Sequence, residues 1–216
     1  MTIEEVKVKI GEVGIIPVVR AANGDEACRA VDAICEGGIS IIEVTMTVPD
    51  APAVIREVIR RYGKKVITGA GTVVTAEQAE RCLDAGAEFL VSPGLSIHML
   101  RAAHKRNVLA IPGALTPTEL MTACEEGASL VKIFPCGNVG GAKYLKSLRA
   151  PFPNAALIPT GGVNVANAAD HIAAGAFALG VGADLVDMSA IRKGDSQKVV
   201  NAAKELMAAV RSARVS

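Results

Sequence analysis

The chain of 216 residues contains no tryptophan, and only 3% of its residues are aromatic. It also carries almost no net charge, because 23 Lys+Arg residues are balanced by 22 Asp+Glu residues. No excess of positive charge is therefore available for nucleic-acid binding. No apolar run approaches the roughly 20 residues that a membrane-spanning helix needs. Since half of the residues are hydrophobic, the composition excludes disorder and predicts a globular protein that binds neither nucleic acid nor membrane.

The cysteines and histidines do not indicate a metal site. The five cysteines are odd in number and match neither a CxxC pair nor a metal-ligand spacing. The first ten residues are charged and lack the apolar stretch of a signal peptide. Both observations predict a cytoplasmic protein with reduced thiols, which serve as small hydrophobic side chains. His98, His104 and His171 lie in predicted helices without ligand spacing and are expected at the surface or partly packed.

Short apolar runs alternate with helical patterns along the whole chain. The runs are continuous, as is typical of parallel strands covered on both faces. Helical stripes lie between them, for example over 27–35 and 51–59, and a closing helix is predicted over 199–210. The alternation predicts one domain, residues 1–216, with an α/β fold: a (β/α)8 TIM barrel with an extra N-terminal helix. An open doubly wound sheet is the alternative. The predicted strands are 15–19, 41–44, 66–68, 89–91, 108–111, 130–134, 156–158 and 177–181.

Two helix starts carry a capping-box pattern. Thr116 is followed by Pro and then by Glu119, and Thr75 is followed three residues later by Gln78. In such a box the threonine hydroxyl accepts the backbone N–H of the residue three positions later, and the side chain of that residue accepts the backbone N–H of the threonine. We therefore expect helices to begin directly after both threonines.

A weak internal repeat aligns two charged residues. In each copy a glycine is expected to end a helix just before a strand. Five residues after the first and third of these glycines stand Glu43 and Lys132, so both occupy the same late position in a strand. Because strand side chains alternate, the two are expected to face the same way. The repeat glycines are Gly38, Gly86, Gly127 and Gly175.

Lys132 and Glu43 are the candidate catalytic residues. Lys132 lies in an apolar strand, where burial favours the uncharged amine that a Schiff-base nucleophile requires. Its simpler interpretation is a strand-end lysine that reaches solvent. Glu43 is a candidate general acid/base, or else the partner of a barrel cation. The second and sixth strands of a barrel lie on opposite sides of one mouth, so an amine would face a carboxylate, as in an aldolase.

Glycine-bearing loops predict where an anion would bind. The loops 160–164 and 180–184 follow the seventh and eighth predicted strands, a position that frequently forms a phosphate site in barrels. Asn164 is expected to cap the following helix. The segment 69–72 brings the Thr72 hydroxyl to the same rim, and Arg20 supplies a cation there for a carboxylate or phosphate.

At these positions the sequence resembles the 2-keto-3-deoxy-6-phosphogluconate (KDPG) and 4-hydroxy-2-oxoglutarate (KHG) aldolase family. The resemblance extends over residues 15–186, and each matching motif lies at a predicted strand end. The motifs are PVVR at 17–20, IEVT at 42–45, GAGT at 69–72, VSP at 91–93, IPG at 111–113, VKIFP at 131–135 and PTGGV at 159–163.

The resemblance implies a class I aldolase that uses no metal or other cofactor and forms a homotrimer. It implies that Lys132 forms an imine with the 2-keto acid substrate and that Glu43 is the general acid/base. The cleavage products would be pyruvate and an aldehyde, either glyceraldehyde 3-phosphate or glyoxylate. The implied substrate-binding residues are Arg20, Thr45, Thr72, Pro93 and Phe134 around the pyruvate portion, with Thr160, Gly161, Gly162, Gly182 and Ala183 at the phosphate end.

Two positions depart from the pattern of many family members. Thr47 stands where many carry Arg, and Ala183 stands where Ser is common. A lost hydroxyl removes one hydrogen bond to a phosphate, so the sequence leaves open whether the substrate is phosphorylated. It also leaves two other functions open: a phosphosugar isomerase or epimerase, and a ligand-binding barrel without catalysis. Neither of these would need the Lys132 amine.

Overall fold

The computed structural model describes residues 1–215, and Ser216, the last residue of the predicted domain, lies outside the described part. Strands and helices alternate along the chain. The strands are β1 (Ile15–Val19), β2 (Ile41–Thr45), β3 (Ile67–Gly71), β4 (Phe89–Val91), β5 (Leu109–Ile111), β6 (Gly113–Ala114), β7 (Val131–Ile133), β8 (Leu157–Pro159) and β9 (Leu179–Val181).

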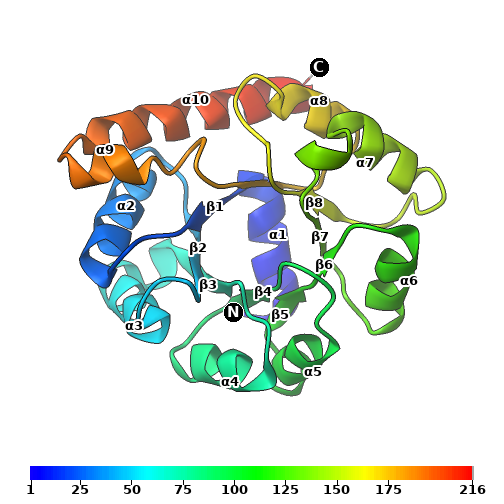
Figure 1. Ribbon diagram of the computed structural model, residues 1–216, viewed down its shortest axis with the longest axis horizontal. Coiled ribbons are helices and arrows are strands. Elements are labelled where there is room, and N and C mark those ends of the chain that lie inside the picture. The colour runs from blue at the N-terminus through cyan, green and yellow to red at the C-terminus, as the bar shows by residue number, and fades with distance from the viewer. Residues whose placement is uncertain (216) are drawn as a thin grey trace.

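Helices cover the outside of these strands, except for α1, which lies in the middle of the view (Figure 1). The helices are α1 (Ile3–Val13), α2 (Gly24–Glu36), α3 (Ala51–Tyr62), α4 (Ala76–Asp84), α5 (Ile97–Lys105), α6 (Pro117–Glu125), α7 (Ala142–Arg149), α8 (Ala168–Ala173), α9 (Met188–Arg192) and α10 (Ser196–Val215). Short 3₁₀ turns lie at Gly63–Lys65 and Gly137–Val139. Within residues 1–215, no helix combines the length and apolar character needed to span a membrane.

The strands pair in parallel and in chain order. One sheet has the order β5-β4-β3-β2-β1-β9, and a second has the order β6-β7-β8. Two features bring the sheets together: a bridge between Thr160 and Gly180, and Pro112, the single residue between β5 and β6. The predicted α/β fold with parallel strands is confirmed. The strand order lacks the reversal of a doubly wound sheet, and the strands form two sheets rather than one continuous ring.

The N-terminal helix was expected and has a clear structural role. Its residues Val6 and Ile10 pack into a cluster with strand residues such as Ile41, Ile67 and Leu130, which lie at or near the starts of their strands. Helix α1 therefore covers the end of the molecule where the strands begin, and Figure 1 shows it between β2 and β7. The opposite end, where the strands finish, is left to the loops that carry the candidate site.

The helix signals are confirmed at some positions and wrong at others. The four repeat glycines all have positive φ between the end of one helix and the next strand. Thr116 and Glu119 form the predicted capping box. Thr75 accepts the Gln78 N–H (3.1 Å), but the Gln78 side chain accepts the N–H of Val74 rather than that of Thr75. That second box is only half formed.

Asn164 does not cap a helix directly. Helix α8 begins at Ala168 with Asn167 as its N-cap. Asn164 instead belongs to the preceding turn, where its side chain accepts the Asn167 N–H at 3.2 Å and Asn167 accepts the Asn164 N–H at 2.9 Å. The prediction was wrong because the glycine loop continues for one more turn before the helix starts.

Candidate active site

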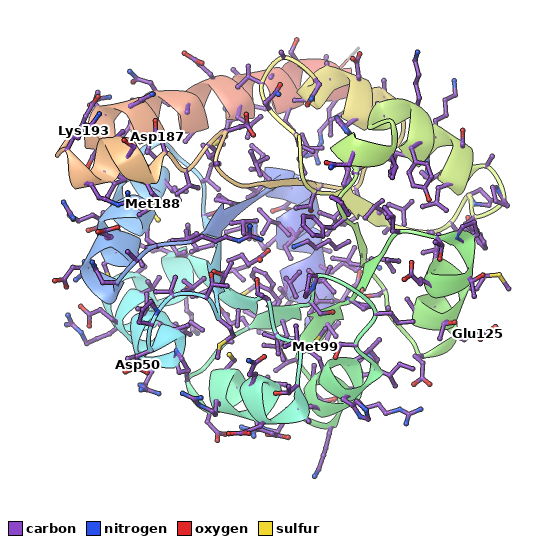
Figure 2. The ribbon with its side chains drawn as sticks, in the orientation of Figure 1. Asp50, Met99, Glu125, Asp187, Met188 and Lys193 are labelled. Carbon is purple, nitrogen blue, oxygen red and sulfur yellow. The ribbon has the colours of Figure 1, made fainter. Side chains whose placement is uncertain are left out.

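Two ionisable side chains are buried among the strands. Glu43 in β2 is 2% exposed, and Lys132 in β7 is 4% exposed. Each stands two residues after a member of the inner cluster, Ile41 or Leu130, so its side chain faces the same interior. Figure 2 shows this interior filled by side chains from the surrounding strands. The structure therefore brings both predicted catalytic residues to one interior, on strands that lie on either side of α1 (Figure 1).

The Glu43 carboxylate is buried with an unsatisfied oxygen. Its Oε1 atom has no hydrogen-bond partner among the described residues. The space it occupies exists because Gly71, at the end of neighbouring β3, has no side chain: a Cβ there would collide with Oε1 and lie 2.6 Å from Cγ. A buried carboxylate oxygen without a donor is unfavourable, so this arrangement suits a group that receives a proton or a hydrogen bond from a bound molecule.

The Lys132 amine lies beside an aromatic ring. Its Nζ lies 5.3 Å from the centre of the Phe134 ring, within the range of a cation–π contact. No ion pair holds Lys132 among the described residues. Its backbone N–H donates to Pro112 O at 2.9 Å, which fixes the strand position. The amine is thus placed without a permanent partner for its charge.

Phe134 also connects Lys132 to the glycine loop after β8. A Cβ on Gly161 would lie 3.3 Å from the edge of the Phe134 ring. Thr160 is 6% exposed, and its hydroxyl donates to Ile158 O at 3.3 Å. A side chain at Gly180 would collide with that hydroxyl. Thr160, Gly161 and Phe134 therefore lie together on the Lys132 side of the site.

Two threonines at the ends of β2 and β3 are held in defined positions. Thr45 is fully buried, and its hydroxyl donates to Val19 O at 3.1 Å while it contacts the Thr47 hydroxyl at 2.6 Å. The Thr45 hydroxyl proton is therefore already donated to another group of the protein. Thr72 has φ +57, which is unusual for a β-branched residue and costs conformational energy. Such strain concentrates at functional positions.

Arg20 and the loop after β9 line a cavity of about 390 Å³. Gly182 and Ala183 contribute to it as predicted, but Gly161, Gly162 and Pro93 are not among its lining residues. Gly162 borders a second cavity, beside α7, and Pro93 borders a third, at the start of α5. The structure therefore brings only part of the predicted phosphate end into one cavity.

Three polar residues of the Arg20 cavity were missed by the sequence analysis: Asp187, Ser189 and Arg192. Ser189 and Arg192 reach it from α9, whose start is marked by Asp187 and Met188 in Figure 2. Arg192 pairs with Glu26 at 3.1 Å, and this hydrogen bond lowers the pKa of the Glu26 carboxyl. Asp187 is the N-cap of this short helix, and its side chain accepts the Ala190 N–H. Because aspartate is a preferred N-cap residue, this position could have located the start of the helix from sequence.

The histidines differ in burial, and Cys136 serves as a small buried side chain, as expected of the cysteines. His98 is exposed and His104 is half-buried, as predicted, but His171 is 2% exposed. The prediction of a surface or partly packed His171 is therefore wrong. Cys136 is fully buried, and this burial raises the pKa of its thiol to about 11. The thiol stays protonated at neutral pH.

The chain matches proteins of known activity over most of its length. A family model described as KDPG and KHG aldolase matches residues 6–202. The KHG/KDPG aldolase of Escherichia coli (strain K12) is 32% identical over 191 residues, which cover 88% of this chain and 89% of that protein. The 2-dehydro-3-deoxy-phosphogluconate aldolase of Treponema pallidum (strain Nichols) is 35% identical over 187 residues, covering 87% and 89%.

A solved structure agrees with these matches. The KDPG aldolase of Legionella pneumophila, with pyruvate captured at low pH as a covalent carbinolamine intermediate, superimposes with a TM-score of 0.86 and 29% sequence identity. The alignment covers 93% of this chain and 97% of that chain. The matches favour the aldolase prediction over the isomerase and the non-catalytic alternatives. The chain belongs to the KDPG and KHG aldolase family and is an aldolase.

Proposed function

We propose that this aldolase reversibly cleaves a 2-keto-3-deoxy-6-phosphoaldonate or 4-hydroxy-2-oxoglutarate through a Schiff base on Lys132. The observation that carries the proposal is the placement of the buried Lys132 amine and the buried, unsatisfied Glu43 carboxylate on one interior face of the strands. The carbinolamine captured in the Legionella relative supports a covalent route. The iminium group itself accepts the electrons, so the proposed reaction uses no metal or other cofactor.

The reaction begins when the uncharged Lys132 amine attacks C2 of the keto acid. Loss of the C2 oxygen as water gives a protonated imine. Glu43, directly or through a water, accepts the proton of the C4 hydroxyl. The C3–C4 bond then breaks, its electron pair moves toward the iminium nitrogen, and an enamine remains on Lys132. The C4 fragment leaves as an aldehyde.

The second half of the reaction regenerates the enzyme. The enamine is protonated at C3 by the carboxylic acid formed on Glu43, and water hydrolyses the resulting imine. Pyruvate leaves and the Lys132 amine is restored. A carboxylate that removes a proton and later returns it needs an oxygen that no other group of the protein occupies. Oε1 of Glu43 is such an oxygen, because it has no hydrogen-bond partner among the described residues.

The resemblance implies a substrate site that extends from the catalytic pair to the rim. Thr45, Thr72, Pro93 and Phe134 would surround the pyruvate portion, and Arg20 would bind an anionic group of the substrate. Thr160 and the glycines at 161, 162 and 182, with Ala183, would bind the distal end through backbone N–H groups. The cavity of about 390 Å³ beside Arg20 supports this assignment for Gly182 and Ala183, which line it.

The proposal also covers the closure of the barrel, the number of domains, the oligomeric state and the cellular location. We also propose that the two sheets together close into one (β/α)8 barrel, supported by the Thr160–Gly180 bridge and by the short interruption at Pro112. The chain is a single domain, it acts as a homotrimer, and it is located in the cytoplasm. Sedimentation equilibrium of the purified protein tests the trimer directly, since a trimer and a monomer differ threefold in mass.

The proposed reaction is tested by measuring pyruvate release from KDPG and from KHG, with lactate dehydrogenase and NADH as the coupling system. The wild-type chain should release pyruvate from at least one of the two. Lys132→Ala should release none above the uncatalysed rate, while its circular dichroism spectrum stays that of the wild type. Unchanged turnover in the folded variant would assign the chemistry to another residue.

A further inference from the structure

A cavity of about 670 Å³ lies between α7 and α8, beside the loop that follows β7. Its lining comes from the 3₁₀ turn, the first turn of α7, Gly162 and the first half of α8, and no residue after β9 contributes to it. It is therefore separate from the Arg20 cavity, although Gly162 belongs to the candidate substrate site. Its polar residues play no part in the proposed aldolase reaction.

The start of α7 offers backbone donors to this cavity. The N-cap residue is Gly141, which has no side chain to accept a hydrogen bond. In the described structure, Leu145 N–H donates to Gly141 O, but the preceding N–H groups of Ala142, Lys143 and Tyr144 have no hydrogen-bond partner. Free N–H groups together with the helix dipole favour an anion at such a position.

His171 provides a second, independent indication of a ligand. It lies in α8, is 2% exposed, and its Nδ1 lies 2.9 Å from Asn167 O. A carbonyl oxygen can only accept, so Nδ1 carries the proton and donates to it. The other ring nitrogen, Nε2, is buried without a partner. A Cβ on Gly141 would lie 3.7 Å from Nε2, so this nitrogen faces the uncapped start of α7.

We propose that the first turn of α7, Nε2 of His171 and the Lys143 side chain form a binding site for a phosphate or carboxylate group. The anion accepts hydrogen bonds from the free N–H groups and from Nε2–H of the imidazolium form. Lys143 lines the same cavity and supplies a further positive charge. Asp170 also lines it, and its repulsion places the anion on the α7 side.

The site adjoins the candidate substrate loop through Asn167. Asn167 Nδ2 donates to Gly162 O at 2.8 Å, and the carbonyl of the same asparagine accepts from His171. Occupancy of the site would therefore stabilise the position of the glycine loop. The proposal does not depend on the aldolase chemistry, because none of its groups contacts Lys132 or Glu43.

The test is a titration of the uniformly ¹⁵N-labelled protein with inorganic phosphate at constant ionic strength and pH 7, followed through the imidazole nitrogen resonances. The chain has three histidines, so single variants assign them. The expected result is a saturable shift of His171 Nε2 toward the imidazolium value, with no such shift of His98. Sodium chloride at the same ionic strength should have no effect.

Two exposed charges allow the site to be tested without disturbing the core. Lys143→Met should weaken phosphate binding and Asp170→Asn should tighten it. Each change should be about threefold, because each variant loses one solvent-exposed charge beside the anion. His98→Asn is the matched control and should bind as the wild type does. Pyruvate release by all three variants should be unchanged in the absence of added phosphate. Absence of a His171 shift, an equal shift with chloride, or equal affinity in the Lys143 and Asp170 variants would overturn the proposal.

Discussion

A Cβ atom on Gly71 would collide with Oε1 of Glu43, so the buried carboxylate of β2 occupies space that a glycine in β3 leaves free. The two residues lie on adjacent strands, where Glu43 is paired with Gly69 and Thr45 with Gly71. Gly71 therefore contributes to the proposed catalytic site by the absence of a side chain. This relationship gives a way to move the carboxylate without changing its chemistry.

Gly71→Ala should displace the Glu43 carboxylate and lower kcat for pyruvate release by at least about 10²-fold, the lower limit for loss of a positioned acid/base. Gly94→Ala is the matched control, because a Cβ at Gly94 meets no atom within 4 Å, and it should keep wild-type kcat. Equal kcat in both variants would mean that the carboxylate position seen here is not the one used in catalysis.

Glu43→Gln should reduce the exchange of pyruvate C3 protons with deuterated solvent by about 10²–10⁴-fold. The amide keeps the size of the side chain but cannot remove a proton. Imine formation does not require that proton transfer, so borohydride trapping of pyruvate should persist in the variant. Exchange at the wild-type rate, measured by proton NMR, would exclude Glu43 as the acid/base.

Ala183→Ser restores a hydroxyl beside the Arg20 cavity. A hydrogen bond to a charged group contributes about 1.5–3 kcal/mol, so kcat/KM for a 6-phosphorylated substrate should rise about tenfold or more. kcat/KM for 4-hydroxy-2-oxoglutarate, which has no phosphate, should stay the same. A similar change for both substrates would show that Ala183 does not contact the phosphate.

The thiols of half-buried Cys35 and of buried Cys82 and Cys136 give a prediction for high pH. Burial raises the thiol pKa from 9.0 to about 12 for Cys35 and to about 11 for Cys82 and Cys136. These thiols ionise more easily in the unfolded chain, so their stabilisation is complete below pH 9 and is lost as pH rises through about 11–12. Urea unfolding should show a falling free energy of unfolding over that range.

The same thiols should be unreactive in the folded protein near neutral pH. Cys124 is exposed, although its thiol pKa is also raised by partial burial. At pH 8 iodoacetamide should therefore modify Cys124 before Cys35, Cys82 and Cys136, as peptide mass spectrometry can measure. Faster modification of Cys35, Cys82 or Cys136 would contradict the described packing.

Much of the fold could be predicted because the local patterns are strong. The predicted strands 15–19 and 89–91 agree with β1 and β4 residue for residue. The prediction for β3 stopped at residue 68, because glycines normally weaken a strand, whereas β3 continues through Gly69 to Gly71. Those glycines stand where the Phe89 ring and the Glu43 carboxylate approach the backbone. Such long-range contacts leave no local signal.

The candidate site was also predictable in part. The repeat placed Glu43 and Lys132 at equivalent strand positions, and both are buried on the interior face. Ser189 and Arg192 were missed, and the sequence offers no local pattern that brings them to Arg20. Arg192, for example, is held by Glu26, a partner 166 residues away in sequence.

The Schiff base on Lys132 is best tested by reducing the protein with sodium borohydride in the presence of pyruvate, followed by peptide mass spectrometry. We expect one adduct of reduced pyruvate, on Lys132, and its formation should inactivate the enzyme in step with labelling. Lys132→Ala should acquire none. An adduct on a different lysine, or full activity after complete labelling of Lys132, would contradict the central claim.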